Sequence, residues 1–300
     1  MNAIEIRNLS KSFRGLYAVD HLNMTVPVGA IYGFIGENGS GKSTTEKLIC
    51  GQLIPDGGEI KLFGRKYDDP GVRMRVGALI ENAGCFPGSS VWDNLMMQVI
   101  NLGLSNPEQE IQRVLEIVRM QDARKIKFKS CSLGMKQRIG IAMALLGNPA
   151  LLILDEPING LDAQGMELMR EILVDITQKY HCTVLIASHI LGELEKIATH
   201  YGILCQGKMI QEISAKEMEA RAKVVVSVKT KDLAGAQQVL KTRFDEVRKH
   251  EDYLEVYDVK DSETIVEYLL NNGHVVNEVK KNKVGLEEYY VQLMTKKEEA

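Results

Sequence analysis

The segment Gly36–Thr44 combines glycines, a lysine and hydroxyl side chains, and it follows an apolar run at Ile31–Ile35. Glycines let backbone N–H groups turn toward a phosphate, and the N-terminus of a following helix adds a favourable dipole. Lys42 can reach the β- and γ-phosphates of a nucleoside triphosphate, and the Ser43 hydroxyl can hold Mg²⁺. The residues expected to contact nucleotide are Gly36, Asn38, Gly39, Ser40, Gly41, Lys42, Ser43 and Thr44.

A second apolar run, Leu151–Leu154, ends in two carboxylates. Asp155, at the tip of a predicted strand, is placed for Mg²⁺, usually through water. Glu156 is placed to orient and activate an attacking water as general base. Taken alone, two acidic residues after an apolar run are more simply explained by an exposed strand end. Lys42 upstream favours the hydrolytic interpretation.

Composition indicates an ordinary globular protein. The length of 300 residues favours about two domains. The net charge of −3 lacks the excess of basic residues that is typical of nucleic-acid-binding proteins. Five cysteines without metal-ligand spacing indicate reduced thiols in a cytosolic chain. Met1–Phe13 is not a signal peptide, and Ile139–Leu154, interrupted at Gly147-Asn148-Pro149, is too short to span a bilayer. We therefore expect a chain that does not cross a membrane but can dock onto a protein that does.

Strand and helix patterns alternate along most of the chain, which predicts an α/β fold with a largely parallel core. Helical periodicity in residues 87–147 predicts a helical subdomain. A charged stretch, Ser214–Lys223, precedes a tail with βαββαβ order, which suggests a small ferredoxin-like sandwich. The predicted domains are residues 1–220 and 221–300. Further predicted elements are strands at Glu59–Phe63, Met74–Ile80, Thr183–Ala187, Tyr201–Gln206 and Lys208–Ile213, and helices at Ser43–Cys50, Met166–Tyr180 and Leu191–Ala198.

Three further segments form a sequence pattern together with the phosphate loop and the two carboxylates. They are Ser132–Gln137 (Ser-Leu-Gly-Met-Lys-Gln), the turn Asn159–Asp162 and the pair Ser188-His189. With the phosphate loop and the two carboxylates, they resemble the ATP-binding cassette (ABC) ATPases over roughly Ile4–Ile213. The resemblance implies a phosphate-loop NTPase fold that binds ATP and Mg²⁺.

The resemblance also implies roles for individual residues. Ser132 and Gly134 would contact the γ-phosphate of an ATP held by the opposite subunit, so two chains would close around nucleotide. Asp162 belongs to the turn associated with nucleotide binding. His189 would sense the γ-phosphate, and Phe13 would stack on adenine. The alternatives are purely structural roles: a helix cap for Ser132, a structural histidine for His189 and core packing for Phe13.

Two departures from the family pattern stand out. Cys131-Ser132-Leu133-Gly134-Met135 replaces the usual Leu-Ser-Gly-Gly-Gln, yet the serine and second glycine remain. Glu81 stands where the family normally has a glutamine that touches Mg²⁺ or water and reports to the membrane partner. A carboxylate keeps a metal-binding oxygen but adds charge beside a polyphosphate, so Glu81 should depend more on Mg²⁺. The alternative is that Glu81 is a solvated glutamate at a strand end without a functional role.

With the terminal Leu286–Tyr290, these features look most like the ATPase subunits of bacterial exporters for bacitracin-type and lantibiotic-type peptides. The resemblance implies a homodimer, or a pair with a homologous ATPase, on the cytoplasmic face of the membrane. It would drive separate integral membrane permease subunits. The alternatives are a soluble cassette ATPase and a nucleotide-gated sensor subunit.

Overall fold

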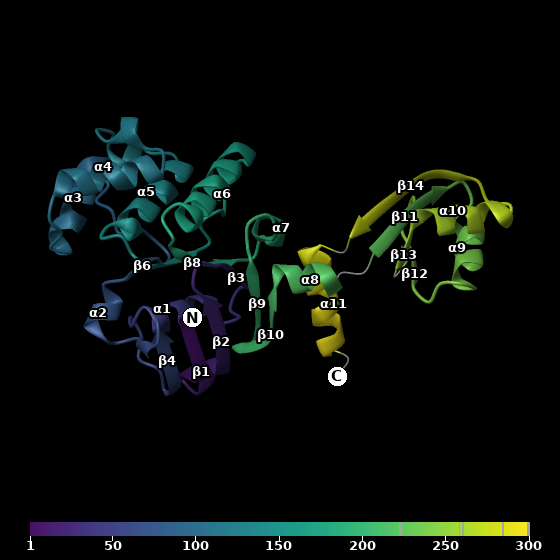
Figure 1. The fold of residues 1–300 in the computed structure, drawn as a ribbon, viewed down its shortest axis with the longest axis horizontal. Coiled ribbons are helices and arrows are strands. Elements are labelled where there is room, and N and C mark those ends of the chain that lie inside the picture. Colours follow the sequence, from purple (N-terminus) through teal and green to yellow (C-terminus); the bar gives the residue numbers. More distant parts are fainter. Residues whose placement is uncertain (222–223, 258, 260, 284, 299–300) are drawn as a thin grey trace. The chain divides into compact units, whose positions relative to one another are not determined.

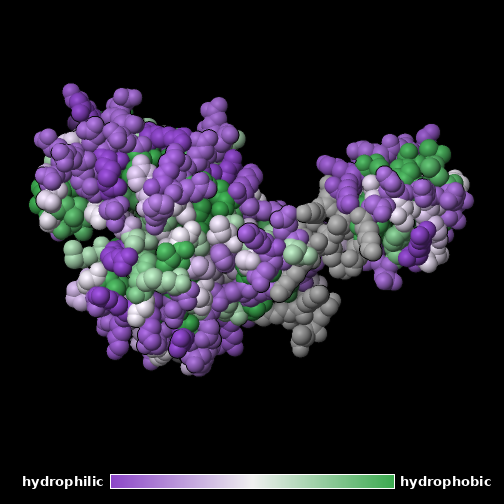
Figure 2. Space-filling model, viewed as in Figure 1, coloured by the Kyte–Doolittle hydropathy of each residue, from purple (hydrophilic) through white to green (hydrophobic). Residues whose placement is uncertain are grey.

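The computed structural model describes residues 1–221, 224–257, 259, 261–283 and 285–298 (Figure 1). Its contacts divide the chain into two units, Met1–Ala215 and Lys216–Ala300. Among the described residues, no helix has the length and apolar character needed to cross a bilayer. Hydrophilic side chains cover most of the visible face of each unit (Figure 2).

A six-stranded sheet forms the centre of the first unit, in the order β10-β9-β3-β8-β7-β6. Its strands from β9 to β6 pair in parallel, and only β10 is antiparallel. Continuous apolar runs form such strands because parallel strands are covered on both faces. The strands are β3 (Ile31–Ile35), β6 (Val76–Leu79), β7 (Leu151–Asp155), β8 (Thr183–Ser188), β9 (His200–Cys205) and β10 (Lys208–Ser214).

An antiparallel sheet, in the order β2-β1-β4-β5, packs beside the parallel one. Period-two alternation places Ile4, Ile6, Leu22 and Met24 on its buried face, in one core with residues of β3, β7 and helix α1. This core fixes the position of the loop between β3 and α1. The elements are β1 (Asn2–Phe13), β2 (Leu16–Pro27), β4 (Gly57–Leu62), β5 (Arg65–Lys66) and α1 (Lys42–Ile49).

Three α-helices lie within residues 87–147: α3 (Val91–Asn101), α4 (Pro107–Ile117) and α5 (Leu133–Leu145). Two short 3-10 helices lie between α4 and α5, at Gln121–Ala123 and Phe128–Ser130. Figure 1 shows the three α-helices grouped near β6. Ser90 and Asp93 form a reciprocal capping box at the start of α3. The remaining helices of the first unit are α2 (Pro70–Arg73), α6 (Ala163–Gln178) and α7 (Leu191–Glu195).

Several predicted boundaries differ from the structure, and two of the differences have a clear local cause. The strand expected at Met74–Ile80 is only β6, because Asp69 caps α2 by accepting from the N–H groups of Gly71 and Val72. Residue Met74 therefore ends a helix. The charged stretch before the tail contains a helix, α8 (Ala215–Arg221), which its alanine and charged residues favour.

The second unit has its own sheet, in the order β12-β13-β11-β14, with every pair antiparallel. Val226, Val228, Leu254 and Val256 form one core with residues of α9 and α10, so both helices cover the same face. The elements are β11 (Val224–Thr230), α9 (Leu233–Lys241), β12 (Val247–Lys249), β13 (Leu254–Tyr257), α10 (Ser262–Asn271), β14 (Val276–Lys283) and α11 (Leu286–Glu298).

Candidate nucleotide-binding and hydrolysis site

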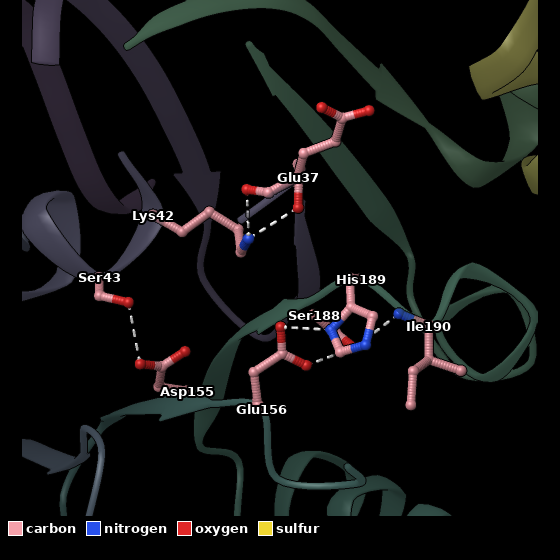
Figure 3. A network of polar contacts seen from close by, with 9 residues as sticks. Glu37, Lys42, Ser43, Asp155, Glu156, Ser188, His189 and Ile190 are labelled. Atoms are coloured by element: carbon pink, nitrogen blue, oxygen red, sulfur yellow. Dashed lines mark hydrogen bonds and ion pairs between the residues drawn. The ribbon is translucent and has the colours of Figure 1, made fainter. Parts of the chain in front are cut away.

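The predicted site residues follow the carboxyl ends of three neighbouring parallel strands. Strand β3 leads into the phosphate loop, β7 ends at Asp155, and β8 ends at Ser188 (Figure 3). Because parallel strands place their carboxyl ends at one edge of the sheet, side chains far apart in sequence meet there. This edge brings the loop, Asp155, Glu156, Ser188 and His189 together.

The phosphate loop requires glycine at two positions. A Cβ at Gly36 would lie 2.4 Å from Ser40 Oγ, and one at Gly41 would lie 2.3 Å from the Ala18 carbonyl oxygen. Gly41 is also the N-cap of α1, with φ of 107°, and no side chain caps the helix there. The first N–H groups of α1 are therefore free of a side-chain cap and suit an anion.

Lys42 is buried, with 6% of its surface exposed. Its Nζ donates to the Gly36 carbonyl oxygen at 2.7 Å and to the Glu37 carbonyl oxygen at 3.1 Å. The two carbonyls hold the ammonium group against the loop (Figure 3). Lys42 also lines a cavity at this edge of the sheet.

A hydroxyl and a carboxylate meet between α1 and β7. Ser43 Oγ donates to Asp155 Oδ2 at 3.0 Å. Burial raises the pKa of Asp155, the Ser43 hydrogen bond lowers it, and the charges of Glu156 and Glu81 raise it. A cation would relieve that repulsion, and hard oxygen ligands suit Mg²⁺. The residues present therefore fit a magnesium ion.

Two neighbours hold the carboxylate of Glu156. His189 Nδ1 lies 2.8 Å from Glu156 Oε1, and Ser188 Oγ donates to Oε2 at 3.2 Å. Since an ionised carboxylate only accepts, Nδ1 is the donor in this contact, and Nε2 remains for another partner. The Glu156 backbone has a positive φ of 50° and its N–H donates to the Ala187 carbonyl at 2.9 Å. Sequence reasoning missed the role of Ser188, whose only signal is its place before His189.

Glu81 contacts a lysine. Its Oε1 lies 2.6 Å from Lys47 Nζ, on the last turn of α1, and 63% of its side chain is exposed. Among the described residues, no hydrogen bond joins Glu81 to Ser43 or Asp155, although the charge of Glu81 raises the pKa of Asp155. Sequence reasoning missed this ion pair, because Lys47 and Glu81 lie in separate motifs.

Glu46 is fully buried on α1, and neither carboxyl oxygen has a hydrogen-bond partner among the described residues. Burial raises its pKa well above the ordinary value, and the charge of Asp155 raises it further. This shift favours the protonated, uncharged form of the side chain, near the Ser43–Asp155 centre. A charged residue at the fourth position after Lys42 is its only sequence signal.

Phe13 ends β1, and 47% of it is exposed. The alternative that Phe13 packs in the core is therefore wrong. The Lys11 ammonium lies 5.6 Å from its ring centroid. The exposed ring is open to a planar base, but it does not line the phosphate-loop cavity.

Ser132, Gly134 and Asp162 lie apart from the phosphate loop. Ser132 Oγ accepts from the Met135 N–H at 3.2 Å and caps α5, and Asp162 caps α6 by accepting from the Gly165 N–H at 2.8 Å. All three line a cavity of about 430 Å³. A different cavity, of about 300 Å³, is lined by Ala18, Asn38, Gly39, Gly41, Lys42, Ser43, Thr44, Asp155 and Glu156.

The geometry defines a phosphate-loop site with a candidate general base, and comparison with known proteins gives its class. The ABC transporter family profile matches residues 19–159. A relative that is 34% identical over 297 residues covers 97% of both chains. The chain belongs to the ABC transporter family and is an ATPase subunit of that class.

That relative is the bacitracin transport ATP-binding protein BcrA of Bacillus licheniformis. The lantibiotic transport ATP-binding protein SrtF of Streptococcus pyogenes is 39% identical over 209 residues, covering 70% of this chain and 90% of SrtF. Among solved structures, one similar chain is cbiO1 from Clostridium perfringens, which is part of the complex cbiONQ. It has a TM-score of 0.67 and 25% identity, and the match covers 73% of this chain and 91% of cbiO1. The dimeric cassette MJ0796 bound to ADP and Pi has a TM-score of 0.64 and 21% identity, covering 71% of this chain and 98% of MJ0796, and shows the fold.

Proposed function

We propose that this ATPase subunit powers export of a peptide antibiotic, or a similar amphipathic compound, by a separate membrane permease. The observation that carries the proposal is similarity to a bacitracin transport ATP-binding protein over 97% of the chain, which includes the second unit. Similarity to transport proteins favours this function over a soluble cassette ATPase or a sensor subunit.

ATP binding is assigned to the loop between β3 and α1. The free N–H groups of α1 and the Lys42 ammonium would hold the phosphates, and the exposed Phe13 ring would stack on adenine. Ser43 and Asp155, with Glu81 as a further ligand, would hold Mg²⁺, which neutralises phosphate charge when bound.

Glu156 is assigned as general base. Hydrogen bonds from Ser188 and His189 fix both of its oxygens, so the carboxylate has a defined orientation. It would accept a proton from water that attacks the γ-phosphorus, and the phosphoanhydride bond would break toward ADP. Nε2 of His189 is the ring nitrogen left for a γ-phosphate, and it would donate to a phosphate oxygen when the imidazole is protonated at that position.

The complete site is assigned to two chains. Ser132 and Gly134 line a cavity different from the one that Lys42 and Glu156 line. A second copy, or a homologous ATPase, would present its Ser132 hydroxyl and α5 N-terminus to the ATP held by the first. Hydrolysis would then require dimerisation on the cytoplasmic membrane face, beneath the permease.

The second unit is assigned an accessory role. Its element order, the strand order β12-β13-β11-β14 and helices on one face support a ferredoxin-like domain. None of the candidate catalytic or nucleotide-binding residues comes from this unit. We expect it to regulate the ATPase or to contribute to dimerisation.

The test expresses the chain with and without a candidate membrane permease, chosen from the reading frames that neighbour its own, in cells sensitive to bacitracin. We expect resistance only when both are present, together with ATP hydrolysis that the permease stimulates. ATP hydrolysis without any resistance to peptide antibiotics would contradict the export proposal while leaving the ATPase assignment intact.

A further inference from the structure

The ion pair between Lys47 and Glu81 joins two elements that both reach the magnesium centre. Lys47 lies in the last turn of α1, the helix that begins with Lys42 and Ser43. Glu81 follows β6, whose parallel neighbour β7 ends at Asp155. Their side chains are 2.6 Å apart. The pair therefore connects the helix that would bind phosphate to the loop after β6.

The backbone at Glu81 is in an uncommon conformation. Its φ is +65°, and the Asn82 N–H donates to the Ile80 carbonyl at 2.9 Å across it. A hydrogen bond over a single residue with positive φ defines a strained form of γ-turn. Such a turn persists where its surroundings hold it. The recorded hydrogen-bond partner of the Glu81 side chain among the described residues is Lys47.

The pair is also easily exchanged. Glu81 is 63% exposed and Lys47 is 30% exposed at the side chain. Exposed ion pairs contribute little because water competes well for both charges. A divalent cation attracts a carboxylate more strongly than one ammonium group does. The Glu81 charge already raises the pKa of Asp155, so its field reaches the residues that fit such a cation.

We propose that Lys47 is a positioning residue that holds Glu81 while the site is free of nucleotide, and that a cation held by Ser43 and Asp155 competes for Glu81. The inference deepens the proposed function and depends on it, since magnesium nucleotide must bind at this centre. Exchange of Glu81 from Lys47 to the cation would release the γ-turn and rearrange the loop that follows.

Cys85 lies in that loop and can report the rearrangement. Its Sγ lies 3.1 Å from Met143 Sδ on α5. Burial raises its thiol pKa to about 11, with a further contribution from Cys131. A half-buried thiol with a high pKa reacts slowly with alkylating agents. Glu81 and Cys85 line the same cavity of about 280 Å³. We therefore expect that release of Glu81 from Lys47 makes the Cys85 thiol more accessible.

The experiment measures the alkylation rate of Cys85 by N-ethylmaleimide in the full chain, using peptide mass spectrometry to separate it from the other cysteines. We expect Lys47→Met to raise the nucleotide-free rate about threefold, a change in the range of exposed ion pairs. Lys47→Arg keeps the charge and should stay near wild type. Mg²⁺ with a non-hydrolysable ATP analogue should raise the wild-type rate but leave the Lys47→Met rate unchanged.

The controls separate this inference from the proposed function. Lys61→Met removes a lysine of similar exposure, paired with Glu59 at 3.0 Å, and should leave Cys85 unchanged. Binding of the analogue is measured in the same samples by calorimetry. Absence of binding to wild type contradicts the proposed function. Binding with equal Cys85 rates for wild type and Lys47→Met, in both states, overturns the role of Lys47.

Discussion

His189 Nδ1 lies 2.8 Å from Glu156 Oε1, and this contact fixes the candidate base relative to the end of β8. The two residues lie 33 positions apart, and each directly follows one of two adjacent parallel strands whose register pairs Asp155 with Ala187. The register places both side chains at the same edge of the sheet. The orientation of the carboxylate therefore depends on strand pairing as well as on the local sequence.

Glu156→Gln should bind ATP with little change but hydrolyse it at least about 100-fold more slowly, because removal of a general base costs on that order. Nucleotide-bound dimers should accumulate. Phosphate release and size-exclusion chromatography with ATP measure both effects. Glu167→Gln, an exposed change on α6, is the matched control. Wild-type turnover in Glu156→Gln would exclude Glu156 as the base.

Ser132→Arg should still bind ATP but fail to form ATP-dependent dimers, because the bulky cation would occupy the place of a partner γ-phosphate. The change also removes the α5 cap, which costs about 1 kcal/mol of stability. Ser132→Thr keeps the hydroxyl and should dimerise. Normal dimerisation of Ser132→Arg in the Glu156→Gln background, seen by light scattering, would argue against a composite site.

Glu46→Gln should become more stable relative to wild type as pH rises. The folded chain keeps a proton on Glu46 at pH values where the unfolded chain, with its pKa near 4.5, has lost it. Above that pH, the stability that Glu46 contributes falls by about 1.4 kcal/mol per pH unit until the raised folded pKa is reached.

The glutamine of the Glu46→Gln variant carries no titratable proton, so this loss disappears in the variant. Denaturant unfolding between about pH 5 and about pH 8 measures the difference. Glu167→Gln should follow wild type across the range. A constant difference between Glu46→Gln and wild type would show that Glu46 does not retain its proton on folding.

A chain that ends near Ala220 should keep ATP binding, because the first unit has its own core and contains every candidate site residue. Binding of a fluorescent nucleotide, alongside a thermal melt that shows folding, is the measurement. A folded truncation that no longer binds nucleotide would place part of the site in the second unit.

Glu81→Ala should lower resistance in cells far more than it lowers ATP affinity, because its loop follows β6 rather than the phosphate loop. Glu81→Gln should retain much of the resistance, since the amide oxygen still accepts from Lys47 and can reach Mg²⁺ or water. Both are compared by inhibitory concentration and ATPase rate. Full resistance in Glu81→Ala would remove Glu81 from the mechanism and leave it a solvated strand end.

The sequence determined the parts of the site that depend on local geometry. Glycines at Gly36 and Gly41, a lysine and a serine after an apolar strand define a phosphate loop, because each property belongs to the residue itself or to its immediate neighbours. Asp155 and Glu156 follow in the same way from their place at the end of β7. The βαββαβ order of the tail was likewise visible from periodicity.

Only the tertiary structure decided which side chains meet. The Lys47–Glu81 pair, the Ser188–Glu156 hydrogen bond and the full burial of Glu46 depend on packing between distant segments. The Lys47–Glu81 pair and the burial of Glu46 result from packing α1 against the sheet, whereas the Ser188–Glu156 bond results from the pairing of β7 with β8. The order of that sheet, β3-β8-β7-β6, differs from chain order. Periodicity reports which face of an element is buried, whereas strand order and register decide which residues from distant segments share that buried space.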